Sequence, residues 1–157
     1  NNGEELPVQR PFNSNCNCRG GTTKCPMEDA RCKDASVLYQ ATVEEEGKPD
    51  QTYTGVAATS WKIRYGNHKS NFTHSAQRVK SSLAGHIWKL KDEGRQYALK
   101  WRTLARLPTY NPGTNSCRLC LCEKYTIMFK PELASLNQRD EFFTHCRHRE
   151  AKLLDKT

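Results

Sequence analysis

The pattern of hydrophobic and polar residues predicts three β-strands. Residues 37–43 (V-L-Y-Q-A-T-V) alternate in the manner of a strand, and residues 51–56 form a second candidate after a loop that contains Gly47 and Pro49. We expect these two strands to pair as an antiparallel hairpin. Residues 97–107 alternate between apolar and basic positions, which predicts a third, half-buried strand.

Three further segments have the spacing of helices. Ser60 is a candidate N-cap for a helix that ends near residue 72. Residues 82–93 place leucine and isoleucine side chains on one face, and residues 117–129 are helical in pattern until Pro131. The order strand, strand, helix, helix, strand, helix predicts a small α+β domain, with an antiparallel sheet and flanking helices.

The length and composition favour one domain. With 157 residues, 36% hydrophobic and 27% charged, the chain has little material for a core, which suits a fold that metal ions stabilise. We divide it into a polar linker or disordered lead (1–15), a cysteine-rich zinc module (16–33), the main domain with a second zinc site (34–150) and a tail (151–157). No apolar run is long enough to cross a membrane, so no membrane partner is expected.

Cysteine and histidine residues form two groups of four possible metal ligands. The first group is Cys16, Cys18, Cys25 and Cys32, and the second is Cys117, Cys120, Cys146 and His148. Sulfur and nitrogen ligands in sets of four are typical of tetrahedral structural zinc sites. The sequence therefore predicts about two structural zinc ions, one for each group.

The cysteines also allow a disulfide framework. Their number, eight, is even, and Asn71 begins a formal glycosylation sequon. However, Cys16 and Cys18 are too close in sequence to pair well with each other, and the Cys146-x-His148 pattern has no use in a disulfide scheme. Zinc is therefore the interpretation we favour.

Cys122 falls outside both groups. On a helix it lies about 160° from Cys120, so we expect Cys122 to be a small buried residue and not a ligand. Whether Cys122 or His145 replaces one of the assigned ligands stays open.

The net charge favours a polyanionic partner. The chain has 25 Lys and Arg against 17 Asp and Glu, a formal net charge of +8, and part of the acidic charge is concentrated in residues 44–46. The middle of the chain is more basic than the total suggests, and basic residues there alternate with aromatic ones: Trp61, Lys62, Arg64, Tyr65, His68, Lys69, Phe72, Trp88, Lys89 and Lys91. Such a surface suits nucleic acid, and an ordinary solvated basic face is the alternative.

A group of polar residues could carry chemistry. Its members are Tyr39, Tyr53, Arg64, His68, Glu123 and Asn137. The separation of the two tyrosines allows them to face each other across the hairpin, and Arg64 and His68 lie one turn apart on the helix that follows. Glu123 lies one helical turn after Cys120. Taken singly, each has a structural alternative. The tyrosines could be sheet-core aromatics, Arg64 and His68 a solvated helix face, Glu123 a surface charge, and Asn137 a turn or helix cap.

In this order the residues resemble the GIY-YIG nuclease family. Val37-Leu38-Tyr39 stands in the place of the first signature triplet, and Tyr53-Thr54-Gly55 in that of the second. Arg64, His68, Glu123 and Asn137 then follow in the order of the family's conserved residues. More narrowly, the chain resembles the C-terminal endonuclease domain of Penelope-like retroelements over about residues 16–150.

The narrower resemblance rests on four stretches of sequence. They are Y-G-N-H-K-S-N-F at 65–72, H-I-W-K-L-K at 86–91, C-R-L-C-L-C-E-K at 117–124 and C-R-H at 146–148. Many members of that group place cysteines between the two triplets. This chain has none there, so its zinc arrangement is a variant.

The resemblance implies a metal-dependent DNA endonuclease that nicks target DNA for retroelement integration. Glu123 would hold one Mg²⁺ or Mn²⁺ ion, Arg64 would bind the phosphate, and Tyr39 would act as general base. Tyr53 would orient the phosphate or the nucleophile, and Asn137 would support Glu123 or the scissile strand. The implied partners are DNA, the reverse transcriptase portion of the same polyprotein and its RNA, and the implied location is nuclear.

A tyrosine base needs help from its surroundings, because a phenol has an ordinary pKa of about 10. Arg64, His68, Lys69 or the metal ion must lower the pKa of Tyr39, or its proton must move by relay. The alternative function is a catalytically silent, zinc-stapled module that binds nucleic acid. A secreted disulfide protein with a glycosaminoglycan-like partner is a third possibility.

Overall fold

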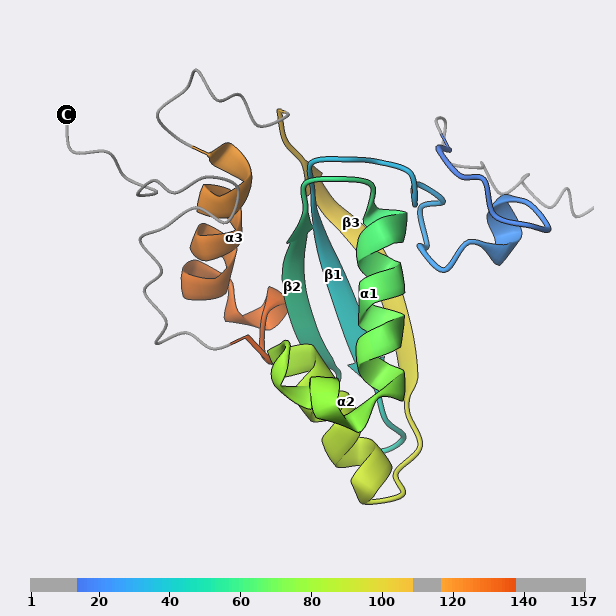
Figure 1. Ribbon diagram of the computed structural model, residues 1–157. Coiled ribbons are helices and arrows are strands. Elements are labelled where there is room, and N and C mark those ends of the chain that lie inside the picture. Colours follow the sequence, from blue (N-terminus) through green and yellow to red (C-terminus); the bar gives the residue numbers. More distant parts are fainter. Residues whose placement is uncertain (1–13, 109–116, 138–157) are drawn as a thin grey trace, which may run out of the picture.

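A three-stranded antiparallel sheet forms the centre of the computed structural model, which describes residues 14–108 and 117–137. The strands are β1 (Val37–Glu44), β2 (Gln51–Ala57) and β3 (Ala98–Arg106), and β1 lies between the other two (Figure 1). β1 and β2 form the predicted hairpin. β3 pairs with the other side of β1 after two intervening helices.

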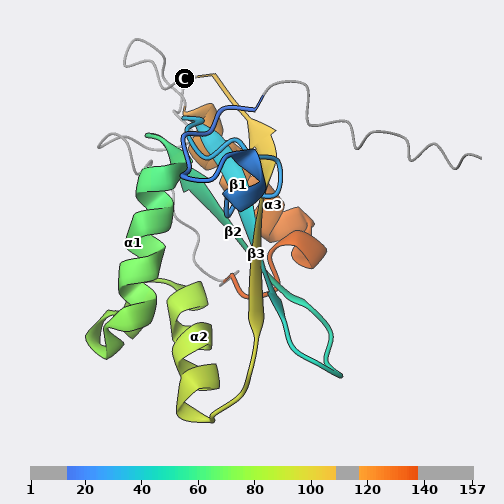
Figure 2. The same ribbon diagram turned by 90° about the vertical axis from the view of Figure 1, so that its right-hand side faces the viewer.

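Helices cover the sheet (Figures 1 and 2). They are α1 (Trp61–Thr73), the 3₁₀ turn η2 (Ser75–Val79), α2 (Ser82–Asp92), α3 (Arg118–Phe129) and the 3₁₀ turn η3 (Pro131–Leu133). Every strand and α-helix predicted from the hydrophobic pattern is present, with ends that differ by about one residue. The small α+β fold class is therefore confirmed. In the described part of the chain no helix has the length and apolar content needed to cross a membrane.

Side-chain alternation along β1 divides the core into two parts. Val37 and Tyr39 belong to the larger part, which contains the buried apolar side chains of α1, α2 and β3: Trp61, Phe72, Leu83, Ala84, Ile87, Leu90 and Trp101. Leu38 belongs to the smaller part, where it packs with Leu119 and Cys120 of α3. β1 is thus covered on both faces, which explains why most of its residues are buried.

The cysteine-rich segment packs into the larger part of the core. Met27 and Cys32 are buried among the residues of the sheet. The Glu28 amide donates a hydrogen bond to the Trp101 carbonyl of β3 at 2.9 Å. Because β3 is an edge strand, the segment covers backbone groups that would otherwise be open to another chain.

The start of α1 is also tied to the cysteine-rich segment. Ser60 occupies the N-cap position, but its side chain makes no capping hydrogen bond, so the predicted side-chain cap is wrong. Instead, the Trp61 amide donates to the Asp34 carbonyl at 2.8 Å, and the Lys62 amide donates to the Cys32 carbonyl at 2.7 Å. Lys62 is at the N2 position, so the Cys32 carbonyl binds an amide that the serine side chain could otherwise bind. The position of α1 depends on the segment that carries the first cysteine group.

Candidate functional site

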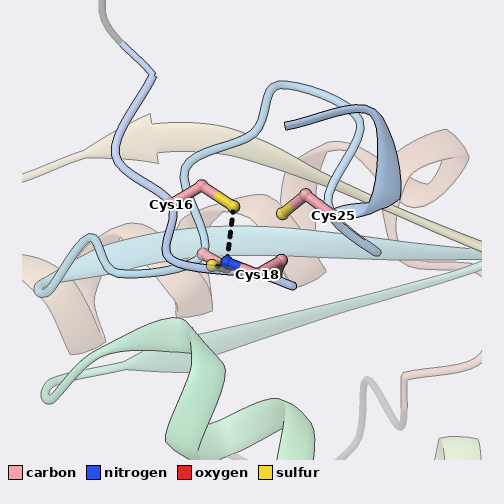
Figure 3. Close-up of side chains that lie close together, drawn as sticks. Cys16, Cys18 and Cys25 are labelled. Atoms are coloured by element: carbon pink, nitrogen blue, oxygen red, sulfur yellow. Dashed lines mark hydrogen bonds between the residues drawn. The ribbon is translucent and has the colours of Figure 1, made fainter. Parts of the chain in front are cut away.

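The four N-terminal cysteines lie together in space. The sulfur atoms of Cys16, Cys18, Cys25 and Cys32 all lie within 4.8 Å of one another, and the first three are labelled in Figure 3. The Cys18 and Cys32 sulfurs are 3.8 Å apart. In a tetrahedral site with Zn–S bonds of about 2.3 Å, neighbouring sulfurs also lie about 3.8 Å apart. The cluster has the ligand type, number and spacing of a structural zinc site and could bind zinc.

The backbone of this cluster suits a metal-bound thiolate. The Cys18 amide donates a hydrogen bond to the Cys16 sulfur at 3.3 Å, which is drawn in Figure 3, and such donors stabilise negative charge on sulfur. Within the described ranges all seven cysteines are free of disulfides, so the disulfide framework is not found there. A closed four-sulfur site leaves no coordination position for a reactant, which makes its role structural.

The second predicted zinc site is described only in part. Cys117 and Cys120 are buried at the start of α3. The remaining candidate ligands lie outside the described residues: His145, Cys146 and His148. The second site therefore stays a prediction. Cys122 packs at the edge of the smaller part of the core and is half-buried, not buried as predicted.

The Tyr39 hydroxyl lies at the centre of the candidate catalytic group. It is 2.6 Å from Nε2 of His68, and it accepts a hydrogen bond from Nε of Arg64 at 3.3 Å. Tyr39 and His68 are fully buried, and Arg64 is half-buried. The structure therefore brings together three of the residues selected from the sequence, one from β1 and two from successive turns of α1.

Gly55 makes room for the Tyr39 hydroxyl. The two residues pair across β1 and β2, and a Cβ atom added at Gly55 would lie 2.5 Å from the hydroxyl oxygen. Any side chain at position 55 would displace Tyr39 or the strand. A glycine inside a strand often marks such a close approach, and this signal was present in the sequence although no role was assigned to it.

The two tyrosines are diagonal neighbours and do not face each other directly, although their separation in sequence allowed it. Tyr39 pairs with Gly55, whereas Tyr53 pairs with Ala41, because the hairpin register offsets the tyrosines by two residues. Both still lie on the same face of the sheet. His68 packs edge-on against each of them, with ring centroids 5.8 Å from Tyr39 and 6.0 Å from Tyr53.

Burial raises the pKa of Tyr39 above the ordinary value of a phenol, and Tyr53 adds to the shift. Arg64 acts in the opposite direction without cancelling it. Burial also opposes the charge of Arg64, but its interactions with the two tyrosine hydroxyls raise the pKa of Arg64 overall, so it stays charged. The protein groups around Tyr39 together leave its pKa above the ordinary value, so a lowered pKa would need the metal ion, and the proton relay is the other route.

His68 is held in its neutral form. Burial, and after it the positive charge of Arg64, lower the pKa of His68 to about 3. Because Arg64 donates to the Tyr39 oxygen, the hydroxyl proton is available for Nε2 of His68, which assigns the ring proton to Nδ1. Nδ1 is buried and has no hydrogen-bond partner among the described residues. The Tyr39 hydroxyl therefore donates a hydrogen bond to neutral His68.

Glu123 lies on the buried side of α3. Its side chain is 2% exposed, which contradicts the alternative of an ordinary surface charge. Its negative charge adds to the upward shift in the pKa of Tyr39. The carboxylate therefore acts electrostatically on the hydroxyl of Tyr39.

The side chain of Asn137 binds the backbone of β2. Its amide accepts a hydrogen bond from the Thr54 amide and donates one to the Thr54 carbonyl, both at 2.9 Å. This pair of bonds imitates the pairing of a neighbouring strand. Since Thr54 lies between Tyr53 and Gly55, Asn137 holds the part of β2 that faces Tyr39.

Two tryptophans enclose the buried group. The Trp101 ring centroid lies 5.3 Å from that of His68 and 6.0 Å from that of Tyr39, and the Trp61 centroid lies 6.5 Å from that of Tyr39. Trp61, His68 and Phe72 are buried, so this part of the predicted basic and aromatic surface belongs to the core. Their burial produces the apolar surroundings that shift the pKa values of the site.

Comparisons with protein-family models, with curated proteins and with solved structures found no match for this chain. The relation to the GIY-YIG family therefore stays a prediction that rests on the residues and their arrangement.

The neutral state of His68 predicts a loss of stability in mild acid. The histidine pKa falls from the ordinary 6.5 to about 3 on folding. The unfolded chain therefore binds a proton that the folded protein excludes, and the stability due to neutral His68 is fully present above pH 6.5 and lost as the pH falls toward 3. Between about pH 6 and pH 5, the free energy of unfolding should fall by about 1 kcal/mol more in the wild type than in His68→Gln.

Urea unfolding at the two pH values measures this difference. His74→Gln changes an exposed histidine and should follow the wild type. The same pH dependence in His68→Gln and the wild type would mean that His68 is not held neutral.

Proposed function

We propose that this protein is a metal-dependent DNA endonuclease of the GIY-YIG type, which hydrolyses phosphodiester bonds by nicking. The observation that carries the proposal is the buried hydrogen bond between Tyr39 and His68, with Arg64 donating to the same hydroxyl. This tyrosine has a route for its proton and a cation beside its oxygen. Core packing alone requires neither, because a phenylalanine would fill nearly the same volume.

Arg64 would bind the non-bridging oxygens of the phosphate. A guanidinium is a planar fork that matches two phosphate oxygens, and Arg64 is charged and lines a pocket at the surface. The substrate would therefore reach the buried group at the position of Arg64. Tyr53, which also interacts with Arg64, would orient the phosphate or the attacking water.

Tyr39 and His68 would move the proton of the attacking water. Tyr39 accepts this proton as its own hydroxyl proton moves to Nε2 of His68, so that no free tyrosinate is required. Burial is the main cause of the low pKa of His68, and the charge of Arg64 is the second. A phosphate at Arg64 offsets the second cause and so raises the proton affinity of the histidine when substrate is bound. The extra proton on His68 returns through Tyr39 to water after the product leaves.

Glu123 fits the protein ligand of a catalytic Mg²⁺ or Mn²⁺ ion. Proteins commonly hold Mg²⁺ by one or two carboxylates together with water and substrate phosphates. Glu123 is a buried carboxylate whose charge acts on the Tyr39 hydroxyl. When bound, such an ion neutralises charge on the phosphate and assists the leaving oxygen.

Zinc at the four-cysteine cluster would support the site mechanically. The ion would fix the backbone of Cys32, whose carbonyl accepts the hydrogen bond from Lys62 at the start of α1. α1 carries Arg64 and His68, so an ordered cluster helps to orient both residues.

The biological setting of the proposal rests on the sequence resemblance alone. By that resemblance the domain cuts target DNA in the nucleus for the integration of a Penelope-like retroelement. Its partners would be the reverse transcriptase portion of the same polyprotein and the RNA of the element.

A zinc-stapled module that binds nucleic acid without cutting it is the second candidate. The burial of Tyr39, His68 and Glu123 favours it, because a substrate can reach these groups only where the surface opens. The basic composition is consistent with both candidate functions and does not distinguish them.

Conversion of a supercoiled plasmid separates the two candidates. The zinc-loaded protein is expected to produce open-circular plasmid with Mg²⁺ and none in the same buffer without divalent ions. Binding without nicking in both buffers would favour the silent module.

A further inference from the structure

The helical layer beside β2 carries an unbalanced positive charge. Residues 51–91 span β2, α1, η2 and all of α2 except its last residue, Asp92, and contain no Asp or Glu. Their basic residues are Lys62, Arg64, Lys69, Arg78, Lys80, Lys89 and Lys91. This segment therefore contributes nearly all of the formal net charge of +8, and its potential favours an anion.

A polar pocket of about 270 Å³ opens within this layer. Its lining residues are all polar or basic: Arg64, Asn67, Ser70, Asn71 and Lys80. Four of them come from one face of α1, because positions three and four residues apart lie on the same side of a helix. Lys80 comes from the connection between η2 and α2. The lining contains no carboxylate that would repel an anion.

The positive charges at the pocket are not neutralised by acidic partners. Among the residues that the structure describes, no ion pair involves Arg64 or Lys80. The neighbouring Arg78, in contrast, pairs with Asp92 at 3.0 Å. α2 begins at Ser82, two positions after Lys80, and the partial positive charge of its N-terminus adds to the field near this lysine.

Arg64 joins the pocket to the candidate catalytic group. Its Nε donates to the Tyr39 hydroxyl at 3.3 Å, and the same side chain lines the pocket. Phosphates on one DNA strand repeat about every 3.4 Å along the helix axis. A strand whose scissile phosphate meets Arg64 therefore brings an adjacent phosphate close to the pocket.

We propose that this pocket binds a second backbone phosphate of the DNA strand, next to the phosphate that meets Tyr39 and Arg64. The proposal rests on the proposed function and defines a subsite for its substrate. Lys80 supplies charge, and Asn67 and Asn71 supply amide donors, which are groups that commonly contact phosphates in protein–DNA complexes. Contacts of this kind carry no base information, so the pocket contributes affinity and register without sequence preference.

Lys80→Ala tests the pocket through binding alone, by fluorescence anisotropy with a DNA duplex in buffer without divalent ions. The slope of log affinity against log salt should become shallower by about 0.9, the change expected when one phosphate contact is lost. Asn71→Ala should weaken binding by about two- to fivefold and leave the salt slope unchanged. Lys48→Ala removes an exposed lysine from the loop between β1 and β2 and should bind like the wild type. Equal salt slopes for Lys80→Ala and Lys48→Ala would overturn the proposal.

Inorganic phosphate distinguishes a DNA subsite from a site for a small anion. In heteronuclear NMR spectra the duplex should shift the side-chain amide signals of Asn67 and Asn71, while inorganic phosphate at the same concentration should leave them in place. Shifts caused by inorganic phosphate and not by DNA would assign the pocket to a small anion and reject the DNA subsite. These binding measurements contain no catalytic ion. A protein that shows the expected salt slopes but does not cut DNA would therefore contradict the proposed catalytic function and still support the phosphate subsite.

Discussion

Glu123→Gln is expected to reduce Mg²⁺-dependent nicking by roughly 10²–10³-fold while the protein stays folded. Glutamine has the shape of glutamate and can fill the same buried position on α3. Its neutral amide, however, is a poor ligand for a hard divalent cation. The loss should fall on kcat, because the carboxylate acts mainly where charge develops in the transition state. Nicking rates at saturating plasmid measure the effect.

Glu46→Gln is the matched control, because Glu46 is exposed in the loop between β1 and β2. It should nick DNA at the rate of the wild type. The melting temperature and zinc content of Glu123→Gln show whether its loss is chemical. A folded Glu123→Gln that cuts DNA like the wild type would show that this carboxylate is not a ligand of the catalytic ion. A variant that melts far below the wild type would assign Glu123 a structural role and favour the silent module.

Cys32→Ser is expected to release zinc from the four-cysteine cluster and to lower the free energy of unfolding by at least about 3 kcal/mol. Cys32 is fully buried in the core, and its carbonyl holds the start of α1 through Lys62. Loss of the ion should therefore loosen the helix that carries Arg64 and His68, and nicking should fall with stability. Zinc per chain and the midpoint of chemical unfolding measure the two effects.

Chelation separates the effect of zinc from the effect of the serine itself. The wild type freed of zinc should unfold at or below the midpoint of Cys32→Ser, because chelation also removes the ion of the second predicted site. Cys122→Ser changes a half-buried cysteine outside the cluster and should keep its zinc at this site. A wild-type protein that contains no zinc when purified with the metal present would end the zinc assignment.

The strands and helices were predictable because each has a local signal. The hairpin alternates along both strands, and α2 has its apolar residues on one face. The position at which α1 starts was predicted correctly, but the groups that cap it were not. Its amides bind the carbonyls of Cys32 and Asp34, and a backbone acceptor from a distant segment leaves no trace in the side-chain pattern. The propensity of Ser60 for capping gave way to this tertiary contact.

The residues of the candidate site could be selected from the sequence, but their geometry could not be predicted from it. Tyr39, Arg64 and His68 could be selected by order and spacing, whereas their hydrogen bonds depend on how α1 packs on the sheet. The direction of the pKa shift in Tyr39 depends on burial beneath Trp61 and Trp101. Sequence pattern assigned Trp61 to a basic surface, because an aromatic residue among lysines and arginines has the same pattern whether its ring points outward or into the core.

Nicking of supercoiled plasmid by the wild-type protein is the measurement on which the nuclease proposal depends. Zinc-loaded protein is incubated with plasmid with and without Mg²⁺, and Glu123→Gln purified in parallel controls for contaminating nuclease. The expected result is open-circular plasmid with wild type and Mg²⁺, none without Mg²⁺, and far less with the variant over the same time. A wild-type protein that retains its zinc, binds the plasmid and leaves it supercoiled in Mg²⁺ or Mn²⁺ would contradict the proposal.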